Sequence, residues 1–258
     1  MATFLRLRQI CLVASDLARE TAHIKAVFGL NECYRGTNVA QFGLENVLFP
    51  VGTDFIEIVS PTRPWTAAGR FLKRHGGRFG YMVIMDCDDP ERRQRHVQGL
   101  GVRIAHVFRH DDYLGVQLHP KDTGAVMIEF NHTIGGEDPT GPYIPAGPDW
   151  QMAVRKDVTR RLLAAEIECP DTGLLAARWG TILERSVQDL GARKFRISLD
   201  VGEISFLPTD SAQAVLAGIE LEVASRATIA AAAQARGRAT GDGVVNVCGV
   251  RFRLTEAR

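Results

Sequence analysis

Two glutamates, Glu57 and Glu129, lie in strand-like stretches of alternating residues, and each directly follows an isoleucine. Two carboxylates that share an apolar cavity repel each other, which raises the pKa of at least one of them toward neutrality. A carboxyl group with such a pKa can exchange a proton on the carbon next to a carbonyl group. The alternative is that each glutamate lies on the solvated face of its strand. The matched pair favours acid/base chemistry.

The spacing of these acids indicates an internal duplication. They are 72 residues apart, and Asp16 and Asp88, the residues expected to cap two helices, have the same separation. Counting back seven residues from each cap acid gives Gln9 and Tyr81, which are again 72 residues apart. The register therefore predicts two copies of one module in the first half of the chain.

The same order of elements is expected in both copies: a strand, a helix and further strands. In the first copy, Asp16 caps a helix from Leu17, and Gly29 ends it. In the second copy, a helix begins near Pro90 and ends at Gly99. The strands that follow these helices are expected at residues 46–51, 54–60, 115–120 and 125–130.

The second half repeats this outline less clearly. A helical stripe includes Leu175 and Trp179, and residues 194–208 alternate with a period of two. Rough alignment places Ser205 and Arg253 where the first half has its acids, so we expect a structural second half. The sequence predicts an α+β fold of four tandem βαβββ modules. Its predicted domains are residues 1–132 with the candidate site, a Pro/Gly-rich linker at 133–150, and a degenerate second domain at 151–258.

Composition narrows the classes of partner. The formal net charge is +1, so no global field attracts nucleic acid or a membrane surface. The five cysteines are scattered without a C-x-x-C pair, which is typical of buried thiols in a reduced compartment. No signal peptide and no stretch of about 18 apolar residues is seen, so we expect a soluble cytoplasmic protein.

Two stretches of the first half resemble a known superfamily. "FLKRHGGRFGYMVIMDCDD" and "LHPKDTGAVMIEF" are similar to the vicinal oxygen chelate (glyoxalase, bleomycin-resistance and dioxygenase) superfamily, and most of all to its methylmalonyl-CoA epimerases. The likeness covers residues 5–131. It implies two glyoxalase-like domains with cupped mixed β-sheets. It also implies a site formed by Gln9, Glu57, Tyr81 and Glu129.

This site departs from the superfamily, whose members usually carry histidine at the first and third of these positions. Without imidazole ligands, an extradiol iron site is not expected. Gln9, Glu57 and Glu129 could hold a hard cation such as Mg²⁺, Mn²⁺ or Ca²⁺, and an empty site is the alternative. Tyr81 is a poor metal ligand because its phenol ionises near a pKa of ~10. Without metal, Tyr81 and Gln9 can donate hydrogen bonds to an enolate oxygen, or else they are a packed ring and a satisfied buried amide.

His119 and Lys121 lie in the turn before the last strand of the second copy. The resemblance implies a place near an acyl-CoA entrance for these two residues, where lysine is a plausible phosphate partner. The alternative is a surface imidazole and a solvated charge.

The function predicted from the sequence is an isomerase, epimerase or lyase. Its substrate would be a small carbonyl or acyl-thioester compound, and proton transfer would be its chemistry, with or without a hard metal. The alternative is a non-catalytic protein that sequesters a small molecule, as the bleomycin-resistance members of the superfamily do. Sheet edges and apolar faces that need cover make a homodimer plausible.

Overall fold

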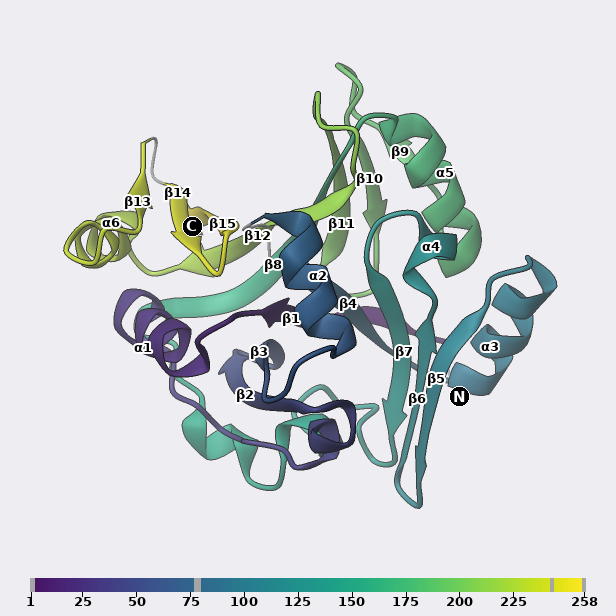
Figure 1. The fold of residues 1–258 in the computed structure, drawn as a ribbon, viewed down its shortest axis with the longest axis horizontal. Helices are drawn as coiled ribbons and strands as arrows, with labels where there is room; N and C mark the ends of the chain where they lie inside the picture. Colours follow the sequence, from purple (N-terminus) through teal and green to yellow (C-terminus); the bar gives the residue numbers. More distant parts are fainter. Residues whose placement is uncertain (1–2, 77–79, 242–243, 257–258) are drawn as a thin grey trace. The chain divides into compact units, whose positions relative to one another are not determined.

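The computed structural model describes residues 3–76, 80–241 and 244–256. It confirms a mixed α+β fold (Figure 1). The residues group into two compact units, each built from three stretches of chain. Unit 1 comprises Met1–Arg8, Met82–Pro142 and Ala164–Leu216, and unit 2 comprises Gln9–Tyr81, Tyr143–Leu163 and Ala217–Arg258. These units follow contacts and not chain order, and the domain boundaries predicted from the sequence stay a prediction.

Four strands pass from one unit into the other: β1 (Leu5–Val13), β4 (Gly80–Cys87), β8 (Thr159–Cys169) and β12 (Val215–Val223). Unit 1 also contains α3 (Pro90–Gly99), β5 (Ile104–His110), β6 (Tyr113–Leu118), α4 (Pro120–Thr123), β7 (Met127–Thr133), α5 (Thr172–Leu183), β9 (Gln188–Asp189), β10 (Phe195–Ser198) and β11 (Glu203–Pro208). Unit 2 also contains α1 (Leu17–Phe28), η1 (Asn38–Phe42), β2 (Leu44–Val51), β3 (Asp54–Pro61), α2 (Ala67–His75), η2 (Ile144–Ala146), η3 (Trp150–Ala153), α6 (Arg226–Gln234), β13 (Ala239–Thr240), β14 (Val244–Val247) and β15 (Val250–Glu256). No helix among the described residues is long and apolar enough to cross a membrane.

Strand pairing follows one pattern in both units. In unit 1, β4 is parallel to β7, and β7, β6 and β5 follow one another as antiparallel neighbours. The strands β8, β11, β10 and β9 repeat this arrangement in the same unit. In unit 2, β1 is parallel to β3, which is antiparallel to β2, and β12 is parallel to β15, which continues to β14 and β13. The last strand before each turn back is therefore held on both sides, and the two candidate acids lie on such strands.

Helix α1 forms where the sequence predicts it. The side chain of Asp16 accepts a hydrogen bond from the backbone N–H of Arg19 at 2.9 Å. Gly29 ends the helix in the left-handed conformation, with φ of 65°. The stripe that includes Ile24 and Phe28 is fully buried. Local capping and the apolar stripe together account for this element.

The predicted cap of the second helix is wrong by one residue. Asp89, and not Asp88, is the N-cap of α3, and its carboxylate accepts from the backbone N–H of Arg92 at 2.8 Å. The physical reason is Pro90, which occupies the first helical turn and disfavours helical geometry in the residue before it. The cap residue is consequently the one directly before the proline.

The register of the first strands is also shifted by one residue. Glu57 lies opposite Cys11, so Gln9 occupies the position two residues before that partner. Glu129 lies opposite Ile84, so the corresponding position is Met82. The separation of 72 residues holds for the last strands, but Tyr81 is one residue out of step with Gln9. Adjacent strand residues point to opposite faces, so the duplication does not support equivalent roles for Tyr81 and Gln9.

The second part of the predicted linker packs into the core of unit 2. Tyr143 and Trp150 are 1% and 3% exposed and belong to one apolar cluster with Leu48 and Phe55. The Phe55 and Tyr143 rings stack with their centroids 4.8 Å apart, and Trp150 contacts Phe55 edge-on at 5.0 Å. This segment therefore contributes buried aromatic area in addition to connecting elements.

Candidate functional site

Glu129 on β7 is a buried carboxylate with three hydrogen-bond donors in unit 1. Tyr113 Oη donates to Glu129 Oε1 at 2.9 Å, and Asn131 Nδ2 donates to the same oxygen at 3.2 Å. Gln117 Nε2 donates to Oε2 at 2.8 Å from the position directly opposite on β6. Strand periodicity explains the set, because Asn131 follows Glu129 by two residues on the same face. Both carboxylate oxygens are thus held in one geometry.

The hydrogen bonds around Glu129 have a defined direction. Asn131 Nδ2 also donates to Tyr113 Oη at 3.2 Å, so the tyrosine oxygen accepts there and its proton points to Glu129. All three donors favour the ionised carboxylate, whereas burial favours the neutral acid. Burial is the larger effect and raises the pKa of Glu129, while Gln117, Tyr113 and Asn131 oppose it. A raised pKa is what a general acid/base near neutral pH requires.

Glu57 on β3 has a corresponding set of partners in unit 2. Gln9 Nε2 donates to Glu57 Oε2 at 2.9 Å, and Asn46 Nδ2 on β2 donates to Oε1 at 2.7 Å. Tyr143 Oη in turn donates to Gln9 Oε1 at 3.0 Å. Glu57 is 7% exposed and Glu129 is 4% exposed. Both acids are therefore buried and not on solvated strand faces, as the alternative required.

Tyr81 on β4 is packed against α2. Its ring meets Phe71 edge-on with centroids 5.1 Å apart. Burial raises the pKa of Tyr81 to about 12, and the positive charges of Arg70 and Arg74 offset only part of that effect. The phenol therefore keeps its proton at neutral pH and is a hydrogen-bond donor. Its proposed role toward an enolate stays a prediction.

His119 and Lys121 lie in the turn between β6 and β7, as the sequence predicts. His119 is the N-cap of the short helix α4, and its Nδ1 accepts from the backbone N–H of Lys121 at 3.3 Å. The Lys121 side chain is exposed. This geometry gives His119 a local structural partner, and binding of a ligand by either residue stays a prediction.

The arrangement around Gln9 and Glu57 does not present a ready set of metal ligands. The Gln9 amide directs its N–H group at Glu57, and its oxygen accepts from Tyr143. A cation that bound both residues would have to displace these hydrogen bonds. Within the described part of the chain, no group of three or more His, Cys, Asp or Glu side chains could hold a metal ion. The metal role of Gln9, Glu57 and Glu129 stays a prediction.

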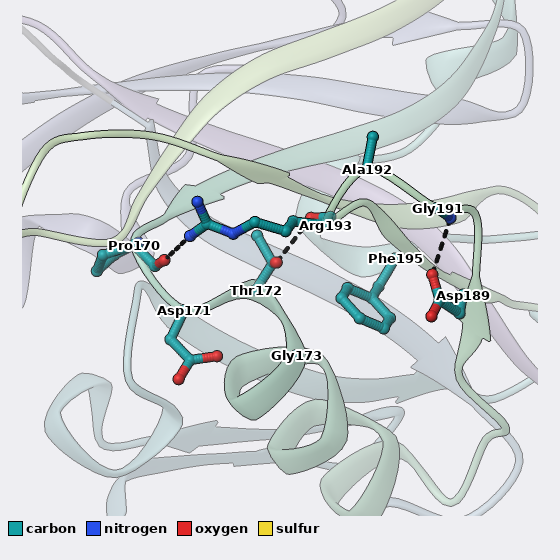
Figure 2. A pocket seen from close by; sticks show the side chains of 9 residues that line it. All are labelled: Pro170, Asp171, Thr172, Gly173, Asp189, Gly191, Ala192, Arg193 and Phe195. Atoms are coloured by element: carbon teal, nitrogen blue, oxygen red, sulfur yellow. Dashed lines mark hydrogen bonds between the residues drawn. The ribbon is translucent and has the colours of Figure 1, made fainter.

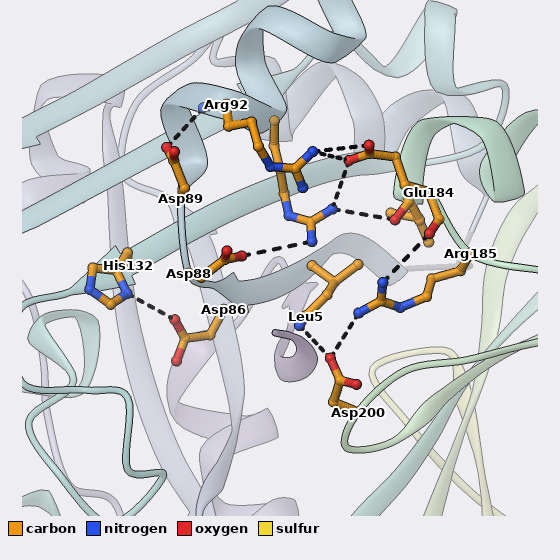
Figure 3. A network of polar contacts seen from close by, with 11 residues as sticks. Leu5, Asp86, Asp88, Asp89, Arg92, His132, Glu184, Arg185 and Asp200 are labelled. Atoms are coloured by element: carbon orange, nitrogen blue, oxygen red, sulfur yellow. Dashed lines mark hydrogen bonds and ion pairs between the residues drawn. The ribbon is translucent and has the colours of Figure 1, made fainter. Parts of the chain in front are cut away.

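A separate polar network of unit 1 is structural (Figure 3). Arg92 on α3 donates to both carboxylate oxygens of Glu184, at 2.9 and 2.7 Å, directly after α5. The neighbouring Arg185 pairs with Asp200 at 2.8 Å, and Asp200 also accepts from the backbone N–H of Leu5 at 2.6 Å. These contacts tie segments far apart in the sequence within one unit.

Five residues that hold the acids were not predicted: Asn46, Tyr113, Gln117, Asn131 and Tyr143. Strand periodicity could have suggested Asn131 from its spacing to Glu129. The others come from neighbouring strands or from the linker segment, and single-sequence periodicity carries no information on those pairings.

No family model matches the chain, and no curated protein matches it. Among solved structures, it is similar to a hypothetical protein from Staphylococcus aureus, with a TM-score of 0.70, 10% identity and coverage of 98% of this chain and 99% of the other. At that identity the likeness shows a shared fold alone.

The chain is also similar to a methylmalonyl-CoA epimerase variant of Streptomyces coelicolor in complex with 2-nitronate-propionyl-CoA. That similarity has a TM-score of 0.46 and 19% identity, and covers 50% of this chain and 98% of the other. Similarity to methylmalonyl-CoA epimerase from Mycobacterium tuberculosis has a TM-score of 0.44 and 21% identity, and covers 50% and 87% of the two chains. No functional argument rests on these partial likenesses.

Proposed function

We propose that the protein is an isomerase or epimerase, or a lyase, that moves a proton on a small carbonyl or acyl-thioester compound. The observation that carries this proposal is the buried carboxylate of Glu129, which has three hydrogen-bond donors and a pKa raised by burial. An ionised carboxylate that is costly to keep charged in its surroundings is a strong base toward a weakly acidic C–H bond.

The proposed step breaks the C–H bond next to the carbonyl. The proton goes to Glu129, and the electron pair of the bond passes to the carbonyl oxygen as an enolate. Return of a proton from the other face gives the epimer, and return at another carbon gives the isomer. Tyr81, whose phenol stays protonated, is the proposed donor to the enolate oxygen. Glu57 enters as a second acid/base residue, with Gln9 orienting its carboxylate.

We place this chemistry in an oxygen-chelate arrangement of four βαβββ modules. The repeated pairing of a first strand parallel to a last strand supports the duplication. The domain boundaries at 132 and 151, a hard cation at Gln9, Glu57 and Glu129, a homodimer and a cytoplasmic location are further parts of the proposal. His119 and Lys121 are its candidate ligand-binding residues. No step in the proposed chemistry passes through a metal.

One observation favours the alternative of sequestration without turnover. Glu57 is held by two amide donors, and the one from Gln9 is itself fixed by Tyr143. Such a closed set of hydrogen bonds stabilises a buried acid without leaving an oxygen obviously reserved for substrate. A binding protein needs no more than this.

Deuterium exchange tests the proposal directly. The purified protein is incubated in heavy water with α-branched acyl thioesters and α-methyl ketones, and deuterium at the α carbon is followed by mass spectrometry. Glu129→Gln is expected to slow exchange by about 100-fold or more, because general base catalysis is lost. Glu45→Gln is the matched control, since Glu45 is a strand glutamate of β2 that is exposed. Equal exchange by Glu129→Gln and wild type would refute the proposal, and saturable binding without any exchange would establish sequestration.

Glu57→Gln and the double variant separate the two acids. If both residues serve one step, the double variant is no slower than the slower single variant. Additive losses would show that Glu57 acts on something else. Metal analysis of the purified protein, before and after chelation, tests the hard cation independently of turnover.

A further inference from the structure

Unit 1 contains a cavity of about 500 Å³ in the part of the chain for which the sequence predicts no function. It lies between the start of α5 and the turn from β9 to β10 (Figure 2). Its lining residues are Pro170, Asp171, Thr172, Gly173, Asp189, Gly191, Ala192, Arg193 and Phe195. A volume of this size is within the range of small-molecule sites.

The walls of the cavity are tied together by Arg193. Its backbone carbonyl accepts from Thr172 Oγ1 at 2.7 Å, and its guanidinium donates to the carbonyl oxygen of Pro170. Ala192 and Arg193 have positive φ values of 50° and 59°, a conformation that is unfavourable for residues with side chains. The tie between the turn and the helix holds this conformation in place, so the cavity is largely pre-formed.

An aromatic ring separates two carboxylates along the floor. A Cβ atom on Gly173 would lie 3.6 Å from the Phe195 ring and 3.8 Å from Asp171 Oδ1, so these two groups flank the same glycine. On the other side, Phe195 lies directly opposite Asp189 in the β10–β9 pair. In Figure 2 the Phe195 ring lies between the two aspartates, and the Arg193 side chain runs along a further side.

The charged groups keep free bonding capacity. Asp171 Oδ1 accepts from the backbone N–H of Leu174 at 3.0 Å, and Asp189 Oδ1 accepts from that of Gly191 at 2.8 Å. Within the described ranges, the second oxygen of each carboxylate has no hydrogen-bond donor. Arg193 likewise forms no ion pair there, and its hydrogen bond to Pro170 engages one of its five N–H groups.

We propose that this cavity binds a small zwitterion with an apolar end, of the apolar amino-acid type. Its ammonium group lies over the Phe195 ring between the two carboxylates, which combines cation–π attraction with charge pairing. Its carboxylate pairs with the Arg193 guanidinium, whose planar donors suit that group. The apolar end meets Leu174 and Leu190, which adjoin the lining residues in sequence and are 71% and 48% exposed. A ligand of one charge would leave either Arg193 or the aspartates unmatched.

The test uses L-leucine and its two halves on the full chain. Isopentylamine carries the ammonium alone, and 4-methylpentanoate carries the carboxylate alone. Binding is followed by ligand-observed NMR titration. We expect L-leucine to saturate the protein below about 10 mM and each half to bind at least tenfold more weakly. No saturation by L-leucine, or equal affinity for either half, would overturn the proposal without any variant.

Variants locate the binding. Asp189→Asn is expected to weaken binding of L-leucine about tenfold, because a charged pair is lost while the turn geometry is kept. Asp138→Asn is the matched control, since Asp138 accepts the backbone N–H two residues later, at 2.8 Å, in the same way but lies outside the cavity. Gly173→Leu fills the floor and abolishes binding. Equal effects of Asp189→Asn and Asp138→Asn, or undiminished binding by Gly173→Leu, would contradict the assignment. Because this site is independent of the proton-transfer proposal, either can fail alone.

Discussion

Tyr113→Phe isolates one hydrogen bond to the candidate base. Tyr113 is 8% exposed, and its hydroxyl proton points at Glu129 Oε1 across 2.9 Å. Phenylalanine keeps the ring and removes the donor. The lost bond favoured the ionised carboxylate, so the pKa of Glu129, already raised by burial, should rise further.

The size of the effect follows from the kind of bond. A hydrogen bond to a charged group contributes about 1.5–3 kcal/mol, and one pKa unit corresponds to about 1.4 kcal/mol. The two remaining donors, Gln117 and Asn131, can take up part of the loss. We therefore expect the pKa of Glu129 to rise by about one unit. Because the folded-state pKa lies above the model value of 4.5, Glu129 favours folding below that value, and this contribution is lost as the pH rises through the folded pKa.

Two measurements check this expectation. Carboxyl ¹³C NMR on protein labelled at glutamate follows the titration of Glu129 directly in wild type and variant. Urea unfolding should show that Tyr113→Phe costs about 1–2 kcal/mol more at pH 8, where the ionised form needs the donor, than at pH 4.5. Tyr143→Phe is the control, because Tyr143 donates to the neutral amide of Gln9 and its cost should not depend on pH. An unchanged or lowered pKa in Tyr113→Phe would refute the reasoning.

Three further predictions concern the rest of the molecule. His132, whose hydrogen bond and charge interaction with Asp86 raise its pKa above 6.5, should stabilise the fold fully below that pH and lose this contribution as the pH rises through the folded pKa; the difference in unfolding free energy between wild type and His132→Gln should therefore shrink toward alkaline pH, and a growing difference would contradict it. Trp179→Phe should lower stability by about 1–3 kcal/mol in thermal unfolding, because the indole N–H donates to the Thr123 carbonyl at 2.9 Å and that oxygen loses its partner. Cys87, buried and with a pKa raised to about 12, should react with a thiol reagent at pH 8 only after unfolding in urea, and rapid labelling of the native protein would count against its burial.

Sequence and structure agree best where one short segment contains the whole cause. Asp16 and Gly29 bound α1 because a cap and a left-handed terminus act within a few residues. The same local logic failed by one residue at α3, where the proline at 90 decided which of two neighbouring aspartates became the cap. The fold class followed from the recurring order of strands and helices.

The candidate acids show the limit of this reasoning. Their strands and their spacing could be read from alternation and counting, but burial of Glu57 and Glu129 could not, because an alternating strand has two faces and the sequence does not say which is covered. The one-residue shift that replaces Tyr81 by Met82 as the counterpart of Gln9 likewise appeared only in the strand pairing.

By itself, the sequence determined the periodicity that makes strands and helices, the ends of α1 and the presence of two carboxylates on related strands. The tertiary structure alone decided which donors surround them, since Tyr143 reaches Gln9 across 134 positions and Tyr113 reaches Glu129 from a neighbouring strand. The physical reason is that hydrogen bonds and burial depend on pairing between distant segments, whereas propensity and capping act over one or two turns of the chain.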